Sequence, residues 1–213
     1  MEESFASGGI RGFVHRPEQE SGDAIVLTHG AGSNCNSPLL VRMARAFADN
    51  GHLVLRYDLP FRVLGKGGPL TGAAAARDRE GVLAAIHAAR ELAGGRVIAA
   101  GHSYGGRQSA MLAAEQPGAA DGLLLLSYPL HPPKKPEQMR TAYFPDLRTP
   151  ALFVHGTADP FGSPEELREA IALIPARTDL LPVEGAAHDL KRAPDLAADI
   201  LTRLHAVVCY SGE

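Results

Sequence analysis

Short apolar runs recur along the chain, separated by segments whose apolar positions follow a helical period. Each run holds four or five residues with almost no alternation, which is typical of strands buried on both faces of a parallel sheet. We predict buried strands at residues 24–28, 53–57, 97–100, 123–127 and 151–154. Residues 180–183 predict a weaker strand because Pro182 interrupts it, and residues 5–15 predict an opening antiparallel strand or hairpin at the sheet edge.

The intervening segments predict helices at residues 38–49, 73–93, 104–115, 164–174 and 194–208. Two of these helices have clear start signals, because a serine that can act as an N-cap precedes a proline in the first turn at Ser37-Pro38 and at Ser163-Pro164. Acidic residues at 165 and 166 lie near the positive end of their helix. Asn-Gly at 50 and 51 predicts the end of the first helix.

Alternating strands and helices predict one α/β domain over residues 1–213. We expect a three-layer α/β/α sandwich with a mostly parallel, doubly wound sheet of about seven strands. Residues 59–72 and 129–149 are too irregular for this rhythm, and long loops in compact domains are often functional. Neither loop is big enough for a helical cap domain, so we expect an open site.

Composition excludes several classes of protein. The 213 residues are 45% hydrophobic and 21% charged, which argues against disorder. A net charge of −3 with no long basic run gives no electrostatic case for nucleic acid or an anionic membrane. Neither a membrane-spanning run nor a signal peptide is evident. We expect a cytoplasmic monomer or homodimer that acts on a small molecule, without nucleic-acid or membrane partners.

The strongest chemical signal is Gly101-His102-Ser103-Tyr104-Gly105, which lies between a predicted strand and a predicted helix. A G-x-S-x-G nucleophile elbow requires this context, because the sharp turn lifts the serine hydroxyl out of the backbone. Gly101 and Gly105 leave room where a Cβ would collide with the neighbouring strand and helix. The helix that starts behind Ser103 offers its positive end to a developing oxyanion.

The first buried strand ends in a glycine-rich turn at residues 28–34, Thr-His-Gly-Ala-Gly-Ser-Asn. Backbone N–H groups in such a turn can converge on an anion, although a plain strand-to-helix turn has the same composition. We predict that the N–H of Ala31, or of Gly32 as second choice, forms an oxyanion hole with the N–H of Tyr104.

The acid and the base are predicted from the chain order Ser…Asp…His. Asp159 follows the strand at 151–154 and is the predicted acid, with Asp146 as the alternative. His188 lies in a glycine-containing loop before the last helix and is the predicted base. Arg62 and His131 lie in the two irregular segments and are candidate substrate contacts, with Gly32.

Six further histidines and Cys35 are predicted to be structural. His29 and His102 flank the site, where elbow geometry favours packing and hydrogen bonding. The others are expected at strand ends or on regular elements: His52, His87, His155 and His205. The two cysteines, Cys35 and Cys209, have no metal-ligand spacing and suggest no disulfide framework, and we expect Cys35 to be buried. We therefore predict no metal-binding residues.

Four segments together resemble the α/β-hydrolase superfamily, and the resemblance spans nearly the whole chain: residues 29–34 (His-Gly-Ala-Gly-Ser-Asn), 56–62 (Arg-Tyr-Asp-Leu-Pro-Phe-Arg), 65–69 (Gly-Lys-Gly-Gly-Pro) and 101–106 (Gly-His-Ser-Tyr-Gly-Gly). The nearest similarity is to small, lidless bacterial members, similar to dienelactone-hydrolase-like proteins and to the testis-expressed and NSL-complex-subunit-like group. The resemblance implies Ser103 as nucleophile, Asp159 as orienting acid and His188 as general base. The chain departs from dienelactone hydrolase itself, whose nucleophile is cysteine.

These observations predict a serine hydrolase that cleaves a small acyl substrate, a carboxylic ester or thioester, through an acyl-enzyme on Ser103. The chemistry requires no metal or organic cofactor. Two alternatives stay open: a non-catalytic binding or scaffold protein with the same fold, and a peptidase, perhydrolase or acyltransferase that uses the same acyl-enzyme. An anionic substrate would be favoured by three basic residues, Arg62, Lys66 and Arg107. Exposure to solvent or packing on a helix also accounts for basic residues at these positions.

Overall fold

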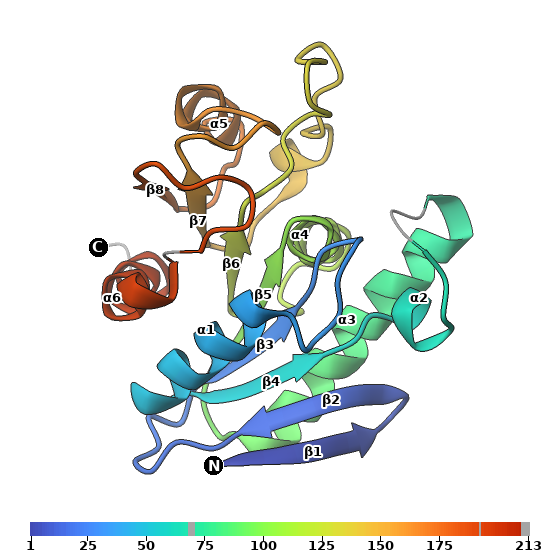
Figure 1. Cartoon of the computed structure of the whole chain (residues 1–213), viewed down its shortest axis with the longest axis vertical. Helices are drawn as coiled ribbons and strands as arrows, with labels where there is room; N and C mark the ends of the chain where they lie inside the picture. Colours follow the sequence, from blue (N-terminus) through green and yellow to red (C-terminus); the bar gives the residue numbers. More distant parts are fainter. Residues whose placement is uncertain (68–70, 192, 210–213) are drawn as a thin grey trace.

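The computed structural model describes residues 1–67, 71–191 and 193–209, and within these ranges eight strands form one sheet (Figure 1). The strand order across the sheet is β1-β2-β4-β3-β5-β6-β7-β8. The hairpin of β1 and β2 pairs antiparallel with β4, and all other neighbours are parallel. The strands are β1 (Glu2–Ser7), β2 (Ile10–His15), β3 (Ala24–Thr28), β4 (Leu53–Tyr57), β5 (Val97–His102), β6 (Gly122–Leu126), β7 (Ala151–Gly156) and β8 (Thr178–Val183).

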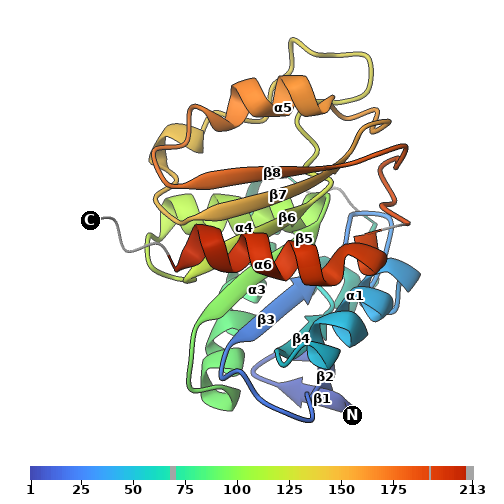
Figure 2. The same ribbon diagram turned by 90° about the vertical axis from the view of Figure 1, so that its left-hand side faces the viewer.

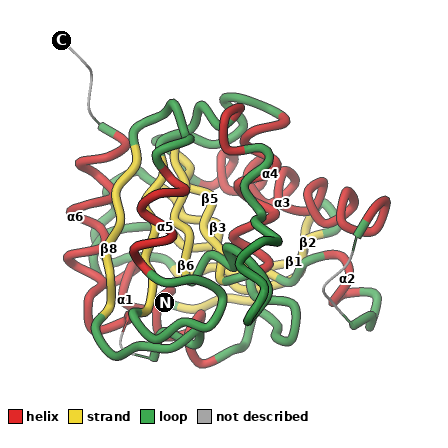
Figure 3. The backbone as a smooth tube through the Cα atoms, turned by 90° about the horizontal axis from the view of Figure 1, so that it is seen from above, coloured by secondary structure: helices red, strands yellow, loops and turns green. Residues whose placement is uncertain are grey.

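Helices cover both faces of the sheet, as Figures 2 and 3 show from two further directions. One face carries α1 (Pro38–Asp49) and α6 (Ala197–Val208), and the other carries α3 (Gly72–Leu92), α4 (Tyr104–Glu115) and α5 (Pro164–Ile171). The short elements are α2 (Pro60–Val63) and the 3₁₀ turns η1 (Phe144–Asp146) and η2 (Ala193–Leu196). Within the described ranges, none of these helices is both long and apolar enough to cross a bilayer.

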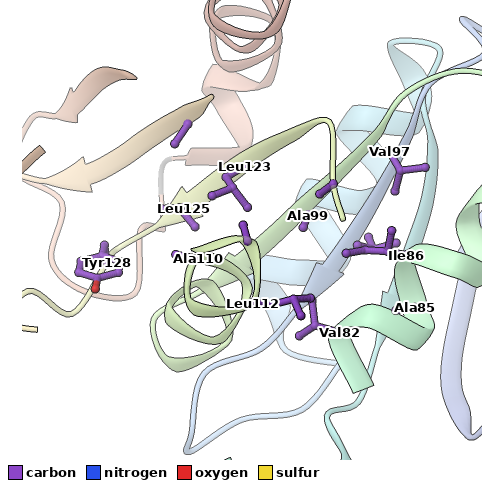
Figure 4. Packing of buried hydrophobic residues seen from close by; sticks show 14 of the residues in the cluster. Val82, Ala85, Ile86, Val97, Ala99, Ala110, Leu112, Leu123, Leu125 and Tyr128 are labelled. Atoms are coloured by element: carbon purple, nitrogen blue, oxygen red, sulfur yellow. The ribbon is translucent and has the colours of Figure 1, made fainter. Parts of the chain in front are cut away.

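The two faces of the central strands pack into separate hydrophobic clusters. In β6, Leu123 and Leu125 face the layer of α3 and α4, where Figure 4 shows them near Ala110. Leu124 and Leu126 face the layer of α1 and α6 instead. Successive side chains of a strand point to opposite faces, so a strand covered on both sides is apolar at every position. This explains why the apolar runs in the sequence do not alternate.

The three-layer α/β sandwich predicted from the sequence is confirmed, with eight strands rather than about seven because the opening segment folds into a two-stranded hairpin. Pro182 is tolerated because β8 is an edge strand that pairs only with β7. The helix predicted at 164–174 ends at Ile171, where i→i+3 hydrogen bonds to Ala170 and Ile171 tighten the chain into a turn.

The start predicted at residue 194 falls in η2, and the α-helix itself begins at Ala197. Ser163 caps α5 as predicted, and a reciprocal hydrogen bond from its own N–H to the Glu166 carboxylate completes a capping box. Of the irregular segment 59–72 and the motif at 65–69, residues 68–70 lie outside the described ranges.

The sheet grows outward in one direction from β3 to β4 and in the opposite direction from β5 onward. β4 lies on one side of β3, whereas β5 and all later strands lie on the other side. In doubly wound sheets such a reversal opens a crevice at the carboxyl ends of the two central strands, where ligands bind. The turn that follows β3 and the start of α4 after β5 approach each other here, because a Cβ on Gly105 would lie 2.6 Å from the His29 carbonyl oxygen.

Candidate active site

Ser103 forms a strained turn between β5 and α4. Its φ of +52° and ψ of −116° lie in a region that residues with a side chain rarely adopt. The Ser103 N–H donates to the Leu126 carbonyl at 2.8 Å, and its carbonyl accepts from the Arg107 N–H at 3.0 Å. The neighbouring strand and the first turn of the helix therefore hold the strained residue from both sides.

The glycines of the elbow are required by close backbone packing. A Cβ on Gly101 would lie 2.5 Å from the Gly105 carbonyl carbon. A Cβ on Gly105 would lie 2.6 Å from the His29 carbonyl oxygen and 2.7 Å from Thr28 Cγ2. These contacts confirm the predicted steric reason for both glycines.

The structure brings together the three residues predicted to be catalytic. The His188 Nε2 lies 2.8 Å from the Ser103 Oγ, and the His188 Nδ1 lies 2.8 Å from the Asp159 Oδ2. A carboxylate only accepts hydrogen bonds, so Nδ1–H donates to Asp159 and Nε2 is left to accept the Ser103 hydroxyl proton. This tautomer is the one in which an imidazole can act as a base toward serine.

Asp159 is buried, with a side-chain exposure of 0%, whereas the His188 side chain is 23% exposed. Burial alone raises the pKa of the Asp159 carboxyl, but the hydrogen bond and charge of His188, the Phe161 N–H at 2.9 Å and the charge of His155 outweigh it, so the net shift is downward. Asp159 therefore stays ionised at neutral pH.

The loop that carries His188 is bonded directly to the end of β7. The Gly185 N–H donates to the Thr157 Oγ1 at 2.9 Å, and the Ala158 N–H donates to the Ala186 carbonyl at 2.9 Å. A Cβ on Gly156 would lie 2.7 Å from the Ala186 carbonyl carbon. These contacts hold Asp159 and His188, which are 29 positions apart in the chain, next to each other.

Two more side chains contact His188. His102 Nε2 lies 2.7 Å from the His188 carbonyl oxygen, which fixes the proton on that nitrogen, and the two rings are 5.1 Å apart. Burial lowers the pKa of His102 to about 4, so the ring is neutral at pH 7. The Phe161 ring lies 4.3 Å from the His188 ring at an interplanar angle of 34°.

For His102 the sequence predicted a packing and hydrogen-bonding role but not its partner. Sequence reasoning missed Phe161, because an aromatic residue two positions after an acid carries no local signal.

Of the predicted oxyanion-hole residues, Tyr104 follows Ser103 directly, and Ala31 lies in a turn that approaches the elbow. A Cβ on Gly30 would be 3.4 Å from the Ser103 Cβ, so the turn after β3 passes directly over the elbow. Ala31 follows in this turn, and Tyr104 begins α4 immediately after Ser103. Gly32, the second choice, is exposed one residue further along the turn.

The Arg62 side chain contacts the backbone of the turn that follows β3. The Arg62 Nη2 donates to the Ala31 carbonyl at 3.0 Å, and the guanidinium lies 5.1 Å from the Phe61 ring. The observed contact orients the peptide bond between Ala31 and Gly32, and the predicted contact of Arg62 with substrate stays a prediction.

A buried carboxylate that sequence reasoning missed ties the surrounding elements together. Asp78 on α3 is fully buried and accepts from the Tyr104 hydroxyl at 2.7 Å and from the Phe61 N–H at 3.0 Å. These bonds join α2, α3 and α4 next to the elbow. A single Asp on an amphipathic helix is usually exposed to solvent, so the sequence did not predict the buried position of Asp78.

His131, another candidate substrate contact, and Asp146, the alternative acid, do not take part in the hydrogen bonds that join Ser103, His188 and Asp159. His131 is 5% exposed, its Nδ1 lies 2.8 Å from the Pro132 carbonyl oxygen, and its Nε2 lies 3.6 Å from a Glu166 carboxylate oxygen. Asp146, the alternative acid, is exposed in η1, and the carboxylate that contacts His188 is that of Asp159.

The fold agrees with several solved structures. A member of the α/β serine hydrolases without lid from Xanthomonas campestris superposes with a TM-score of 0.75 at 16% identity, covering 100% of this chain and 96% of that chain. Est1E from Butyrivibrio proteoclasticus gives 0.75 at 17% identity, with 98% and 99% covered. Dienelactone hydrolase from Anabaena variabilis gives 0.71 at 17% identity, with 97% and 96% covered.

At these identities the structural likeness establishes the fold alone, and it supports the expectation of a small hydrolase fold without a lid. Sequence similarity goes further, because residues 21–208 match the family model described as an alpha/beta hydrolase domain. This match covers most of the chain, including β3, β5 and the segments that hold Ser103, Asp159 and His188. The chain is therefore a member of the alpha/beta hydrolase domain family.

Proposed function

We propose that this protein is a serine hydrolase that cleaves a small acyl substrate, a carboxylic ester or a thioester, through an acyl-enzyme on Ser103. The observation that carries the proposal is the unbroken hydrogen-bond chain from Asp159 through His188 to the Ser103 hydroxyl. A serine hydroxyl is a weak nucleophile unless a base takes its proton, and this chain supplies both the base and a group that orients it.

In the first step the Ser103 Oγ attacks the carbonyl carbon of the substrate while His188 Nε2 takes the hydroxyl proton. The carbonyl π electrons move onto oxygen, and the N–H groups of Ala31 and Tyr104 are the proposed donors to this oxyanion. Such donors are each worth about 10²–10³ in rate. The ionised Asp159 stabilises the imidazolium that forms on His188.

In the second step the oxyanion collapses and the bond to the leaving group breaks. His188 Nε2–H gives its proton to the departing oxygen or sulfur, which leaves an ester between the acyl group and Ser103. Water then enters, His188 takes one of its protons, and the hydroxide attacks the acyl carbon. The Ser103 Oγ departs with the proton from His188, and the carboxylic acid is released.

The test is Ser103→Ala, assayed on short p-nitrophenyl esters and matched thioesters. We expect kcat/KM to fall by about 10³-fold or more, with an unchanged circular dichroism spectrum. Ser109→Ala is the matched control, because Ser109 lies on α4 shortly after the elbow and its hydroxyl donates to the Gly105 carbonyl at 3.0 Å.

A fluorophosphonate should label Ser103 stoichiometrically, and Ser103→Ala should remove that label. Activity that survives Ser103→Ala within a few-fold would refute the acyl-enzyme. A wild-type protein that neither turns over esters nor takes the label would indicate a binding protein instead.

A further inference from the structure

A second cluster of polar side chains lies at the edge of the sheet opposite to Ser103. Asp23 directly precedes β3, His52 directly precedes β4, and His205 lies in the last turn of α6. One ligand atom from each residue lies within 4.8 Å of the other two. Because β3 and β4 are parallel, their amino ends meet at this end of the sheet, whereas Ser103 follows the carboxyl end of β5 at the opposite end.

The two imidazoles face each other through their Nε2 atoms, which are 3.3 Å apart. The His52 Nδ1 lies 3.2 Å from the Asn50 carbonyl oxygen. A carbonyl oxygen only accepts, so Nδ1 carries the proton and Nε2 presents its lone pair toward His205. Metal-binding histidines are commonly oriented in this way, by a backbone carbonyl on the far nitrogen.

The spacing of the two nitrogens agrees with metal coordination. A tetrahedral Zn²⁺ holds imidazole nitrogens at about 2.0–2.1 Å, which places two of them about 3.3 Å apart. An ordinary N–H···N hydrogen bond between the rings would also bring the nitrogens together, so the spacing is compatible with both arrangements and metal titration distinguishes them.

Asp23 supplies the third ligand and a negative charge. Its carboxylate accepts three hydrogen bonds from Arg96: from the backbone N–H at 2.9 Å, from Nε at 3.4 Å and from Nη2 at 2.8 Å. A carboxylate offers about four lone-pair positions, so these three bonds leave about one for an ion, and a carboxylate oxygen lies within 4.8 Å of a ring nitrogen of each histidine. The Cys209 thiol, one turn beyond His205, contacts Arg96.

We propose that Asp23, His52 and His205 form a binding site for a divalent transition-metal ion, with Zn²⁺ as the reference ion. Two imidazoles and one carboxylate are a ligand set that suits Zn²⁺ and its neighbours. The ion would join the end of α6 to the starts of β3 and β4 and would stabilise the fold, with no part in acyl transfer. No metal-binding residues were expected from the sequence, in which positions 23, 52 and 205 lie far apart.

The experiment is isothermal titration of the full chain with ZnCl₂ after treatment with a chelator, combined with thermal unfolding. We expect one equivalent to bind and the melting temperature to rise. His205→Gln should weaken this binding at least about tenfold, because loss of even an outer-shell partner typically costs 10–100-fold. His52→Gln should do the same, which covers the case in which one variant does not fold.

Matched controls separate this site from other zinc ligands. His87→Gln removes an exposed histidine on α3 and should leave the binding constant unchanged. Cys209→Ser tests whether the exposed thiol binds zinc, and His188→Ala tests whether the histidine beside Ser103 does. Both variants should still bind one equivalent of Zn²⁺.

Absence of binding to the wild-type protein would overturn the proposal, and so would equal affinities of His205→Gln, His52→Gln and His87→Gln. The readout is independent of ester turnover, so its failure leaves the proposed hydrolase function in place.

Discussion

His102 offers a direct test of how the elbow positions the base. Its Nε2–H donates to the His188 backbone carbonyl at 2.7 Å, and its ring lies against the His188 ring. The side chain does not contact the Ser103 hydroxyl, so it acts through His188 as a positioning residue. We predict that His102→Leu removes the hydrogen bond while keeping an apolar side chain of similar bulk.

The expected magnitude follows from these contacts. Leaving the His188 carbonyl without its partner costs about 1–3 kcal/mol of unfolding free energy. A displacement of the base by about 1 Å can cost about 10²-fold in rate. We therefore expect kcat on p-nitrophenyl acetate to fall about 10- to 100-fold, with little change in KM, because the lost interaction orients the base and does not bind substrate.

The assay compares kcat, KM and urea unfolding for the wild type, His102→Leu and His102→Gln. The amide of Gln can place an N–H near the position of the imidazole Nε2, so it should recover part of kcat. A purely structural role would lower stability in both variants without selective recovery of kcat. If His102→Leu keeps wild-type kcat, the positioning role is refuted.

Three further predictions concern the site and the fold. Asp159→Asn should lower kcat by about 10⁴-fold because it favours the wrong His188 tautomer, and this is checked by steady-state kinetics with near-native unfolding curves. Gly105→Ala should destabilise the protein by at least about 1–3 kcal/mol, since its Cβ would lie 2.6 Å from a backbone oxygen, whereas Gly94→Ala, with nothing within 4 Å, should be nearly neutral; urea unfolding compares the two. Burial lowers the pKa of His15 from 6.5 to about 4, and the charge of Arg56 lowers it further. Between these pH values the unfolded chain binds a proton that the folded protein does not. The folded state therefore loses about 3 kcal/mol of stability, which is fully present above pH 6.5, as the pH falls to about 4. Unfolding midpoints between pH 7.5 and 4.5 measure this loss, which should be smaller in His15→Gln; equal slopes would contradict it.

Most of the fold could be predicted because its signals are local. The central strands are covered on both faces, so burial leaves an unbroken apolar run in the sequence, and the predicted bounds of β3 and β4 agree with the structure to the residue. Helix α1 begins at a proline in its first turn and also agrees. The elements that were harder to predict, β8 and the start of α6, depend on an edge position and on a 3₁₀ turn.

The sequence by itself determined the alternation of strands and helices, the elbow at Ser103 and the order in which an acid and a base should follow. Only the tertiary structure decided that Asp159 and His188 reach Ser103, because strand ends far apart in the chain meet at one edge through sheet order and loop contacts. The same physical reason applies to the His102 contact with His188 and to the group of Asp23, His52 and His205. Contacts between distant segments leave no periodic trace in a sequence, whereas burial and turn geometry do.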